Sequence, residues 1–313
     1  LHTLTTPAAL SLSLWSCASS AVSMERRQHI VLVPFLAQGH IIPFLELAKL
    51  IDRRYPGRFT VTIVSTPLNV RNLRSSLPPH SSVVLRELPF HSADHGLPPE
   101  TENTDSVTRH SLLRLFQASG SLRPQFERLV AEGMTRRPLC IIADVFTSWT
   151  VHIAKQLGVF HAIFTTCGGF GTAAYFSLWL HLPHAHTASG DEFGVPGFPE
   201  TYRLRRSQLP RALKVAKGGR DPWVVFMRDL VTHYCSSDAM LCNTVEALEP
   251  AGTALLRSNT GLRMWSIGGP VLPMETKFAG GRAGKTLGIA PEACIEWLDA
   301  HPPRSVLYVS FGS

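Results

Sequence analysis

The sequence predicts an α/β fold built on a doubly wound parallel sheet. Apolar runs of strand length recur along its first half, at residues 29–35, 59–65, 82–88, 139–143 and 160–165. These runs are apolar throughout rather than alternating, which is typical of strands covered on both faces. Segments with helical spacing of apolar residues separate them. Strands that alternate with helices indicate right-handed crossovers within one parallel sheet.

The segments that follow each strand complete this pattern. We expect helices from near Ile42 and at 107–116, 122–132, 147–157, 223–236 and 245–256, with further short strands at 239–243 and 263–267. A Gly-rich basic stretch then reads as an interdomain linker. A short helix at 294–300 and an apolar strand at 305–310 start a second unit. We therefore expect a leader of doubtful origin at 1–23, a complete Rossmann-like domain at 24–268, a linker at 269–290 and the start of a truncated domain at 291–313.

Composition limits the class of protein. With 313 residues, 44% hydrophobic and 17% charged, the chain can bury a sizeable core. Its net charge of +7 comes from scattered Lys and Arg without a nucleic-acid-binding motif, so no nucleic acid is expected. Six cysteines without a C-x-x-C pair suggest a reducing compartment, and we expect a cytoplasmic monomer. No stretch reaches the ~18 apolar residues of a membrane span.

The first 23 residues have two readings. They carry no charged residue and include an apolar run at 8–17, which suggests a signal peptide. A signal peptide, however, begins with Met and a basic segment, whereas the first methionine here is Met24. We expect translation to start at Met24.

His40 is the first candidate for chemistry. It follows the first expected strand, after Gly39, at the sheet edge where ligands of open α/β sheets bind. The positive end of the next helix favours the neutral imidazole, and a neutral imidazole can act as a general base. A histidine that only caps the helix is the alternative.

Asp144 follows the fourth expected strand and should lie at the same edge as His40. A carboxylate within hydrogen-bond reach would fix the tautomer of His40 and stabilise its protonated form. Asp is also a good cap for the helix expected after it. The two roles are compatible.

Two other motifs compete with this site. Gly169, Gly171 and Ala174 give G-x-G-x-x-A, the fingerprint of NAD(P)-binding oxidoreductases, but they follow the fifth strand rather than the first. His181, His184 and His186 could suggest a metal site, but no carboxylate or Cys completes the set, so we expect a solvated loop and no metal.

Several segments resemble the plant family 1 UDP-dependent glycosyltransferases in the order in which that family carries them. They are HIVLVPFLAQGHIIPFLELAKLI, CIIADVF, FTTCGGFGTAAYFSLWLHLP, LCNTVEALEP and IEWLDAHPPRSVLYVSFGS. The resemblance implies a GT-B fold, with the acceptor in the N-terminal domain and the UDP-sugar mainly in the C-terminal one. It implies an inverting transfer with His40 as the catalytic base, Asp144 as its partner, and no metal or other cofactor.

The resemblance also implies the ligands and their sites. The acceptor would be a small plant metabolite, a flavonoid, other phenolic, terpenoid or hormone, and the co-substrate a UDP-sugar, with UDP-glucose the first expectation. The family's HCGWNS donor signature is absent. A truncated chain that binds small molecules without catalysis therefore remains an alternative. The expected donor-binding residues are Gly312 and Ser313, and the expected acceptor-binding residues are Gln38, Gly39, Phe90, Phe146, Thr166, Gly168, Phe170, Tyr175 and Trp179.

Overall fold

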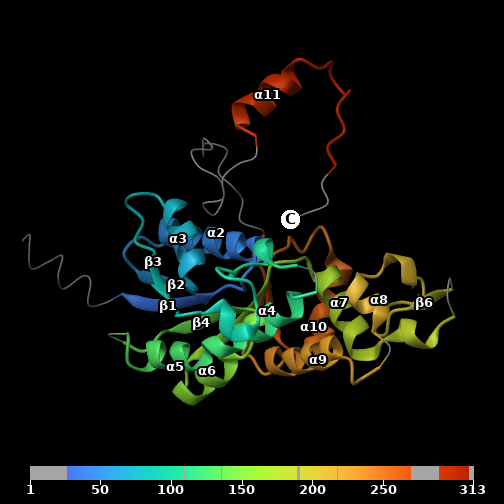
Figure 1. Ribbon diagram of the computed structural model, residues 1–313, viewed down its shortest axis with the longest axis horizontal. Coiled ribbons are helices and arrows are strands. Elements are labelled where there is room, and N and C mark those ends of the chain that lie inside the picture. The colour runs from blue at the N-terminus through green and yellow to red at the C-terminus, as the bar shows by residue number, and fades with distance from the viewer. Residues whose placement is uncertain are drawn as a thin grey trace, which may run out of the picture.

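A parallel sheet forms the centre of the molecule. The computed structural model describes residues 27–108, 110–134, 136–188, 191–216, 218–268 and 289–309. Within these ranges seven strands pair in the order β3-β2-β1-β4-β5-β8-β9, and every pairing is parallel (Figure 1). The strands are β1 Gln28–Val33, β2 Phe59–Ser65, β3 Val84–Glu87, β4 Cys140–Asp144, β5 Phe160–Thr165, β8 Ala239–Cys242 and β9 Arg263–Ser266.

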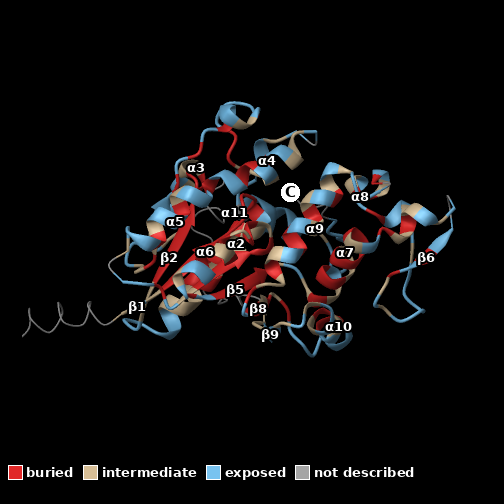
Figure 2. Ribbon diagram, turned by 90° about the horizontal axis from the view of Figure 1, so that it is seen from below, coloured by how far each residue is buried: buried red, intermediate tan, exposed pale blue. Residues whose placement is uncertain are grey.

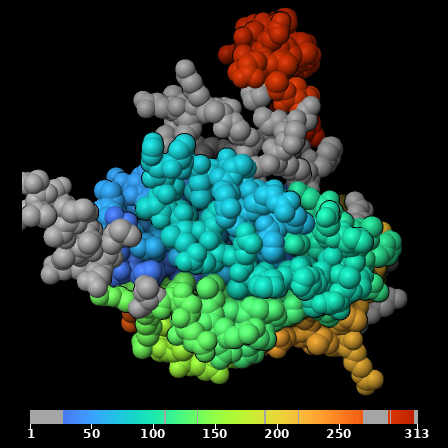
Figure 3. All heavy atoms as spheres, turned by 60° about the vertical axis from the view of Figure 1, so that its left-hand side comes forward, coloured from blue at the N-terminus to red at the C-terminus, as the bar shows by residue number. Residues whose placement is uncertain are grey.

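Helices cover both faces of this sheet. They are α2 Gln38–Arg54, α3 Pro67–Ser75, α4 Leu112–Ser119, α5 Arg123–Ala131, α6 Thr150–Leu157, α7 Gly169–His181, α8 Arg211–Val215, α9 Pro222–Tyr234, α10 Pro250–Thr260 and α11 Pro291–Asp299. A two-stranded antiparallel hairpin, β6 Glu192–Gly194 with β7 Arg203–Arg205, lies beyond α7. Helix α11 stands apart from the body of the sheet domain (Figure 3).

The alternation of side chains along each strand creates two hydrophobic cores. In β1, Val31 and Val33 face the core built with α4, α5, α6, α7, α9 and α10. Ile30 and Leu32 face the other core, which α2 and α3 complete. Buried residues therefore run along the strands between two layers of helices, as Figure 2 shows. This is the doubly wound arrangement that the all-apolar strands predict.

The chain reverses its direction of winding between β1 and β4. From β1 the strands proceed to β2 and β3 on one side, and from β4 to β5, β8 and β9 on the other. Strands β1 and β4 pair directly, with Val33 opposite Ala143. Their carboxyl ends thus open side by side at a topological switch point, where open α/β sheets bind ligands.

The predicted strands are confirmed within the sheet, but two expectations about elements are wrong and two further elements were not expected. The helix expected at 245–256 is α10 at Pro250–Thr260, because Pro250 occupies its first turn and residues 245–249 form a loop. Residues 305–309 form no strand and are exposed, because no described strand pairs with them. Helix α3 and the β6–β7 hairpin were not expected; Pro67 at the start of α3 was the available signal.

Other expectations fall where placement is not described. The leader at 1–23, the linker at 269–288, and Gly312 and Ser313 lie outside the described residues. Among the described helices, none has the length and apolar character needed to cross a membrane.

His161 shows how tightly the sheet is packed. It is fully buried in β5, with Nε2 2.9 Å from Thr150 Oγ1 and Nδ1 2.9 Å from Ser237 Oγ. Because the Thr150 hydroxyl donates to the Thr147 carbonyl, Nε2 of His161 donates to Thr150 and Nδ1 accepts from Ser237. Burial, with nearby cationic Lys155, lowers the pKa of His161 to about 3. The ring is therefore held neutral.

This burial predicts a loss of stability in mild acid. In the unfolded chain His161 binds a proton near its usual pKa of 6.5, whereas the folded protein resists protonation down to about pH 3. Stability is thus complete above the unfolded pKa and falls as the pH drops below it. Between about pH 7.5 and about pH 5.5 this group should cost the fold about 1 kcal/mol. Urea unfolding at the two pH values should show a smaller pH effect in His161→Gln; an equal effect would contradict this account.

Candidate active site

His40 lies in the first turn of α2. We expected the helix to begin near Ile42, with His40 in the preceding loop, but α2 begins at Gln38. Ala37 is the extended residue before the helix, and its carbonyl accepts from the amides of His40 and Ile41, at 2.9 and 2.8 Å. The imidazole is thereby fixed to a rigid element directly after β1.

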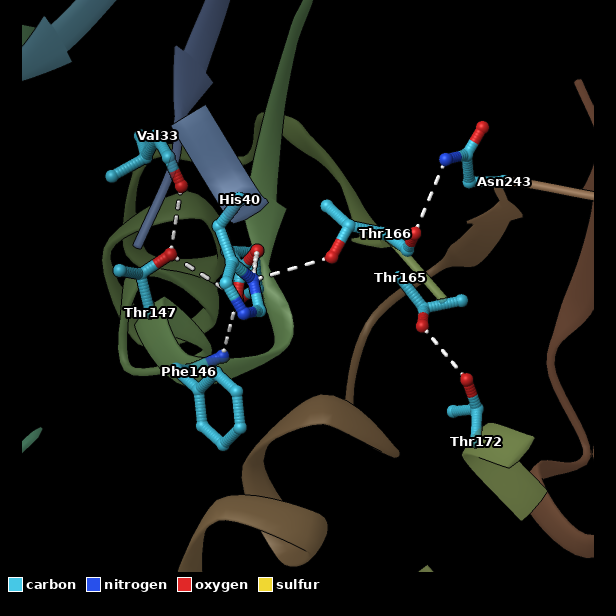
Figure 4. A network of polar contacts seen from close by, with 9 residues as sticks. Val33, His40, Phe146, Thr147, Thr165, Thr166, Thr172 and Asn243 are labelled. Carbon is cyan, nitrogen blue, oxygen red and sulfur yellow. Dashed lines mark hydrogen bonds and ion pairs between the residues drawn. The ribbon is translucent and has the colours of Figure 1, made fainter. Parts of the chain in front are cut away.

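Asp144 holds His40 from the neighbouring strand. Its Oδ2 lies 2.7 Å from Nδ1 of His40, and its side chain is completely buried. Its Oδ1 accepts from the amide of Phe146 at 2.9 Å and so caps the short 3₁₀ helix Val145–Thr147. Figure 4 shows this network at the ends of the two strands. The capping and the orienting roles, alternatives in the sequence, are both present.

Thr147 ties together the two strands that carry this pair. Its hydroxyl lies 2.8 Å from the carbonyl of Val33, at the end of β1, and 3.2 Å from that of Asp144, at the end of β4. The relative position of His40 and Asp144 is therefore set by the sheet and by an added buried hydrogen bond, not by flexible loops.

The electrostatics of His40 differ from the expectation. Burial lowers the pKa of His40, but the charge of Asp144 and its hydrogen bond raise it, and the resulting pKa lies above the usual value. The carboxylate at 2.7 Å therefore outweighs burial, and the net direction of the pKa shift is opposite to the neutral form expected from the helix end. With Nδ1–H directed at Asp144, Nε2 carries the lone pair of the neutral ring. That nitrogen can take a proton from a ligand.

Aromatic rings surround the imidazole on one side. Ring centroids of Phe35 and Phe146 lie 5.7 and 5.4 Å from that of His40. Phe116 packs against both, at 4.3 and 4.7 Å, and belongs to α4. Of these rings only Phe146 was among the predicted site residues. Phe35 ends the apolar run of the first strand, a signal that could have indicated it.

Helix α9 extends this aromatic group. Trp223 and Phe226 each meet Phe116 edge to face, with centroids 5.5 and 5.7 Å apart. Both side chains are partly exposed, as are Phe116 and Phe146. We call these four residues with Phe35 the aromatic wall. It joins four separate segments of the chain, which is why the spacing of residues in the sequence did not reveal it.

The structure brings some of the predicted acceptor residues to His40. Thr166 Oγ1 lies 3.3 Å from Nδ1 of His40. Gln38 and Gly39 share the first turn of α2 with His40, Gln38 buried and Gly39 exposed. Gly168 precedes α7 at its N-cap. These residues occupy the edge where a ligand of His40 would lie.

Other predicted acceptor residues occupy different surroundings. Phe90 and Trp179 are core residues, 6% and 1% exposed, so the expectation that they face a ligand was wrong. Trp179 stacks on Trp223, and the ring of Tyr175 meets that of Trp179 edge to face. Phe170 packs against two rings of the loop before β7, Phe198 and Tyr202. Large apolar rings next to a sheet enter the core because burial stabilises them.

The backbone amides of the G-x-G-x-x-A motif are already hydrogen-bonded to a side chain of the protein. The carboxylate of Glu249 accepts from the amides of Gly169 and Phe170, at 2.8 and 2.9 Å. These are the amides at the start of α7 to which a pyrophosphate would bind. Thr244 donates a further hydrogen bond to the same carboxylate. Gly169 instead allows close packing against α10, because a Cβ there would lie 3.1 Å from the Cα of Thr253.

The three histidines after α7 do not form one group. His181 and His186 are exposed, as expected for a solvated loop. His184 is instead buried, and its Nε2 lies 3.2 Å from the carbonyl of Ala216. Burial lowers the pKa of His184. Over the described ranges, no cluster of His, Cys, Asp or Glu has the arrangement of a metal site.

Known proteins share this architecture and much of this sequence. No protein-family model matches the chain. It is 52% identical to crocetin glucosyltransferase 3 of Crocus sativus over 293 residues, which is 92% of this chain and 60% of the relative. It is 33% identical to UDP-glucose flavonoid 3-O-glucosyltransferase 7 of Fragaria ananassa, covering 91% of this chain and 57% of that one.

A solved structure agrees with these relatives. Glycyrrhiza uralensis UGT73P12, complexed with glycyrrhetinic acid 3-O-monoglucuronide, matches with a TM-score of 0.74 and 27% identity over 92% of this chain and 57% of its own. The fold and the sheet-edge site thus define the N-terminal Rossmann-like domain of a GT-B protein. The chain is similar to plant UDP-glycosyltransferases over more than nine tenths of its own length. It spans about 60% of the length of the curated relatives it matches.

Replacing Asp144 tests the electrostatics of the pair. Asp144→Asn keeps an acceptor for the Phe146 amide but presents an NH₂ group to His40. The burial that remains should then bring the pKa of His40 below its usual value, and the hydrogen should move from Nδ1 to Nε2. Imidazole ¹⁵N shifts followed through a pH titration would report both changes. Asp52→Asn, remote from the site, is the matched control; a His40 pKa that stays high in Asp144→Asn would refute the arrangement.

Proposed function

We propose that this chain supplies the acceptor-binding half of an inverting glycosyltransferase, which moves a sugar from a UDP-sugar to a hydroxyl of a small plant metabolite. The observation that carries the proposal is the 2.7 Å contact between His40 Nδ1 and Asp144 Oδ2 at the topological switch point. The imidazole is 20% exposed, so it can reach a ligand while its partner stays buried. The similarity to plant UDP-glycosyltransferases supports the reaction class.

In the proposed reaction, Nε2 of His40 accepts the proton of the acceptor hydroxyl. The acceptor oxygen forms its new bond to C1 of the sugar as the bond from C1 to the UDP oxygen breaks on the opposite face. UDP leaves with the electron pair of that bond, and the anomeric centre is inverted. Asp144 stabilises the imidazolium that forms, and a general base of this kind contributes roughly 10²–10⁴-fold to the rate.

The aromatic wall supports an acceptor with a flat or extended apolar body. Its partly exposed rings, Phe116, Phe146, Trp223 and Phe226, lie within contact distance of one another beside His40. Aromatic side chains bury large apolar surfaces and prefer offset or edge-to-face contacts with other rings. We therefore propose a flavonoid, other phenolic, terpenoid or hormone as the acceptor. Two relatives are named for crocetin and for a flavonoid.

The donor side is proposed from the relatives alone. UDP-glucose is the co-substrate that we propose, because the names of two relatives specify a glucosyltransferase. Gly312 and Ser313, outside the described residues, are proposed to contact it. We propose that no metal or redox cofactor takes part, since the displacement transfers no electrons between substrates and the base is a side chain.

Substituting His40 tests the proposal in the complete enzyme. His40→Ala should reduce UDP-glucose-dependent glucosylation of a panel of plant aglycones by roughly 10²-fold or more, because the base is lost. Product formation measured by liquid chromatography, with ¹H NMR of the anomeric proton to show inversion, would check it. The control is His80→Ala on an exposed loop. Near-normal turnover by His40→Ala would sink the assignment of the base.

A further inference from the structure

The loop between β5 and α7 lies against His40. The loop between β8 and α10 is hydrogen-bonded to that first loop. We propose that Asn243 is a positioning residue for His40, acting through Thr166. The inference rests on the proposed function, because the position of His40 matters only if it is the base. Its contacts, however, can be tested without any turnover.

Asn243 contacts two successive residues at the end of β5. Its side-chain Nδ2 donates to the carbonyl of Thr166 at 3.1 Å, and its backbone amide donates to the carbonyl of Thr165 at 3.0 Å (Figure 4). The backbone bond extends the pairing of β8 with β5 by one residue. The side-chain bond holds the chain just after β5 ends, where no strand pairing remains to do so.

Thr166 transfers this restraint to the imidazole. Its hydroxyl lies 3.3 Å from Nδ1 of His40, the atom that also contacts Asp144. On the other side, the hydroxyl of Thr165 lies 2.9 Å from that of Thr172 in α7. The Thr166 side chain therefore lies next to the His40–Asp144 hydrogen bond, and its backbone is held in place by Asn243.

Glu249 secures the far end of the same loop. Its two hydrogen bonds to the amides of Gly169 and Phe170 fix the start of α7. The Sγ of Cys242 adds a contact of 3.5 Å to the Cys167 carbonyl. Between these anchors, the Asn243 side chain supplies the restraint closest to Thr166.

The physical effect of this restraint is shielding. A hydrogen bond between charged groups is stronger where water is excluded. If Thr166 moved away, water could reach Nδ1 and compete with Asp144. Without the Asn243 side chain, the Thr166 carbonyl would also lose its described hydrogen-bond partner. The loop would then relax toward solvent, and the orientation of His40 would be less sharply defined.

NMR of the imidazole in this chain tests the proposal. In Asn243→Leu, exchange of the His40 Nδ1 hydrogen with water should accelerate about tenfold, because the site opens locally. The pKa of His40 should fall toward its usual value as the interaction with Asp144 weakens. Asn72→Leu in α3 is the matched control, the same substitution at a partly buried position away from the site. A folded Asn243→Leu chain with unchanged exchange and titration would overturn the proposal.

A second variant keeps the test decisive if Asn243→Leu does not fold. Thr166→Ala retains the carbonyl that Asn243 holds, but removes the part of the side chain that lies next to Nδ1 of His40. It should accelerate the same exchange, and the double variant should show little further change, because both act through one contact. Normal exchange in Thr166→Ala would refute the proposed route. Active His40→Ala enzyme would instead refute the proposed function and leave these contacts unaffected.

Discussion

The buried carboxylate of Asp144 is the constraint on which the site depends. An isolated ionised carboxylate is costly inside a protein, and leaving a buried charge without its partner costs about 3–5 kcal/mol. Here both oxygens are satisfied, one by the amide of Phe146 and one by His40. The requirement to satisfy Asp144 therefore fixes the imidazole as well. Stability and the geometry of the site share one interaction.

The sheet places Asp144 and His40 within hydrogen-bond distance on rigid elements. Asp144 ends β4, while His40 begins the helix after β1, and those two strands are direct neighbours. Because the two strands are parallel neighbours, their carboxyl ends meet at the same edge of the sheet. Residues more than a hundred positions apart in the sequence are thereby brought together. Thr147 then locks the two strand ends together. His40, the base that we propose, is thus held by elements that the pairing of the strands fixes in place.

The sequence predicted the sheet and the pair because both rest on local signals. A run of apolar residues of strand length is recognisable in the sequence. A polar residue directly after such a strand must lie at the carboxyl edge of the sheet. The aromatic wall was missed because Phe35, Phe116, Phe146 and Trp223 come from four segments whose meeting depends on how helices pack. Trp179 illustrates the opposite error, a residue expected at the ligand site that lies in the core. A large indole ring suits a pocket or a core equally, and here it is buried against Trp223. The strands and their parallel arrangement were predictable from the sequence, whereas the direction in which large rings point was not.

Glu249 explains why one apparent cofactor motif has no cofactor to bind. The start of α7 has the free amides and the glycines that suit a phosphate, and a carboxylate from the next crossover fills the place. An anionic ligand there would have to displace a hydrogen-bonded carboxylate and face its charge. The start of α7 is therefore closed to such a ligand by the protein's own carboxylate. The motif instead serves the site indirectly, because Glu249 fixes the loop that carries Thr166 to Nδ1 of His40.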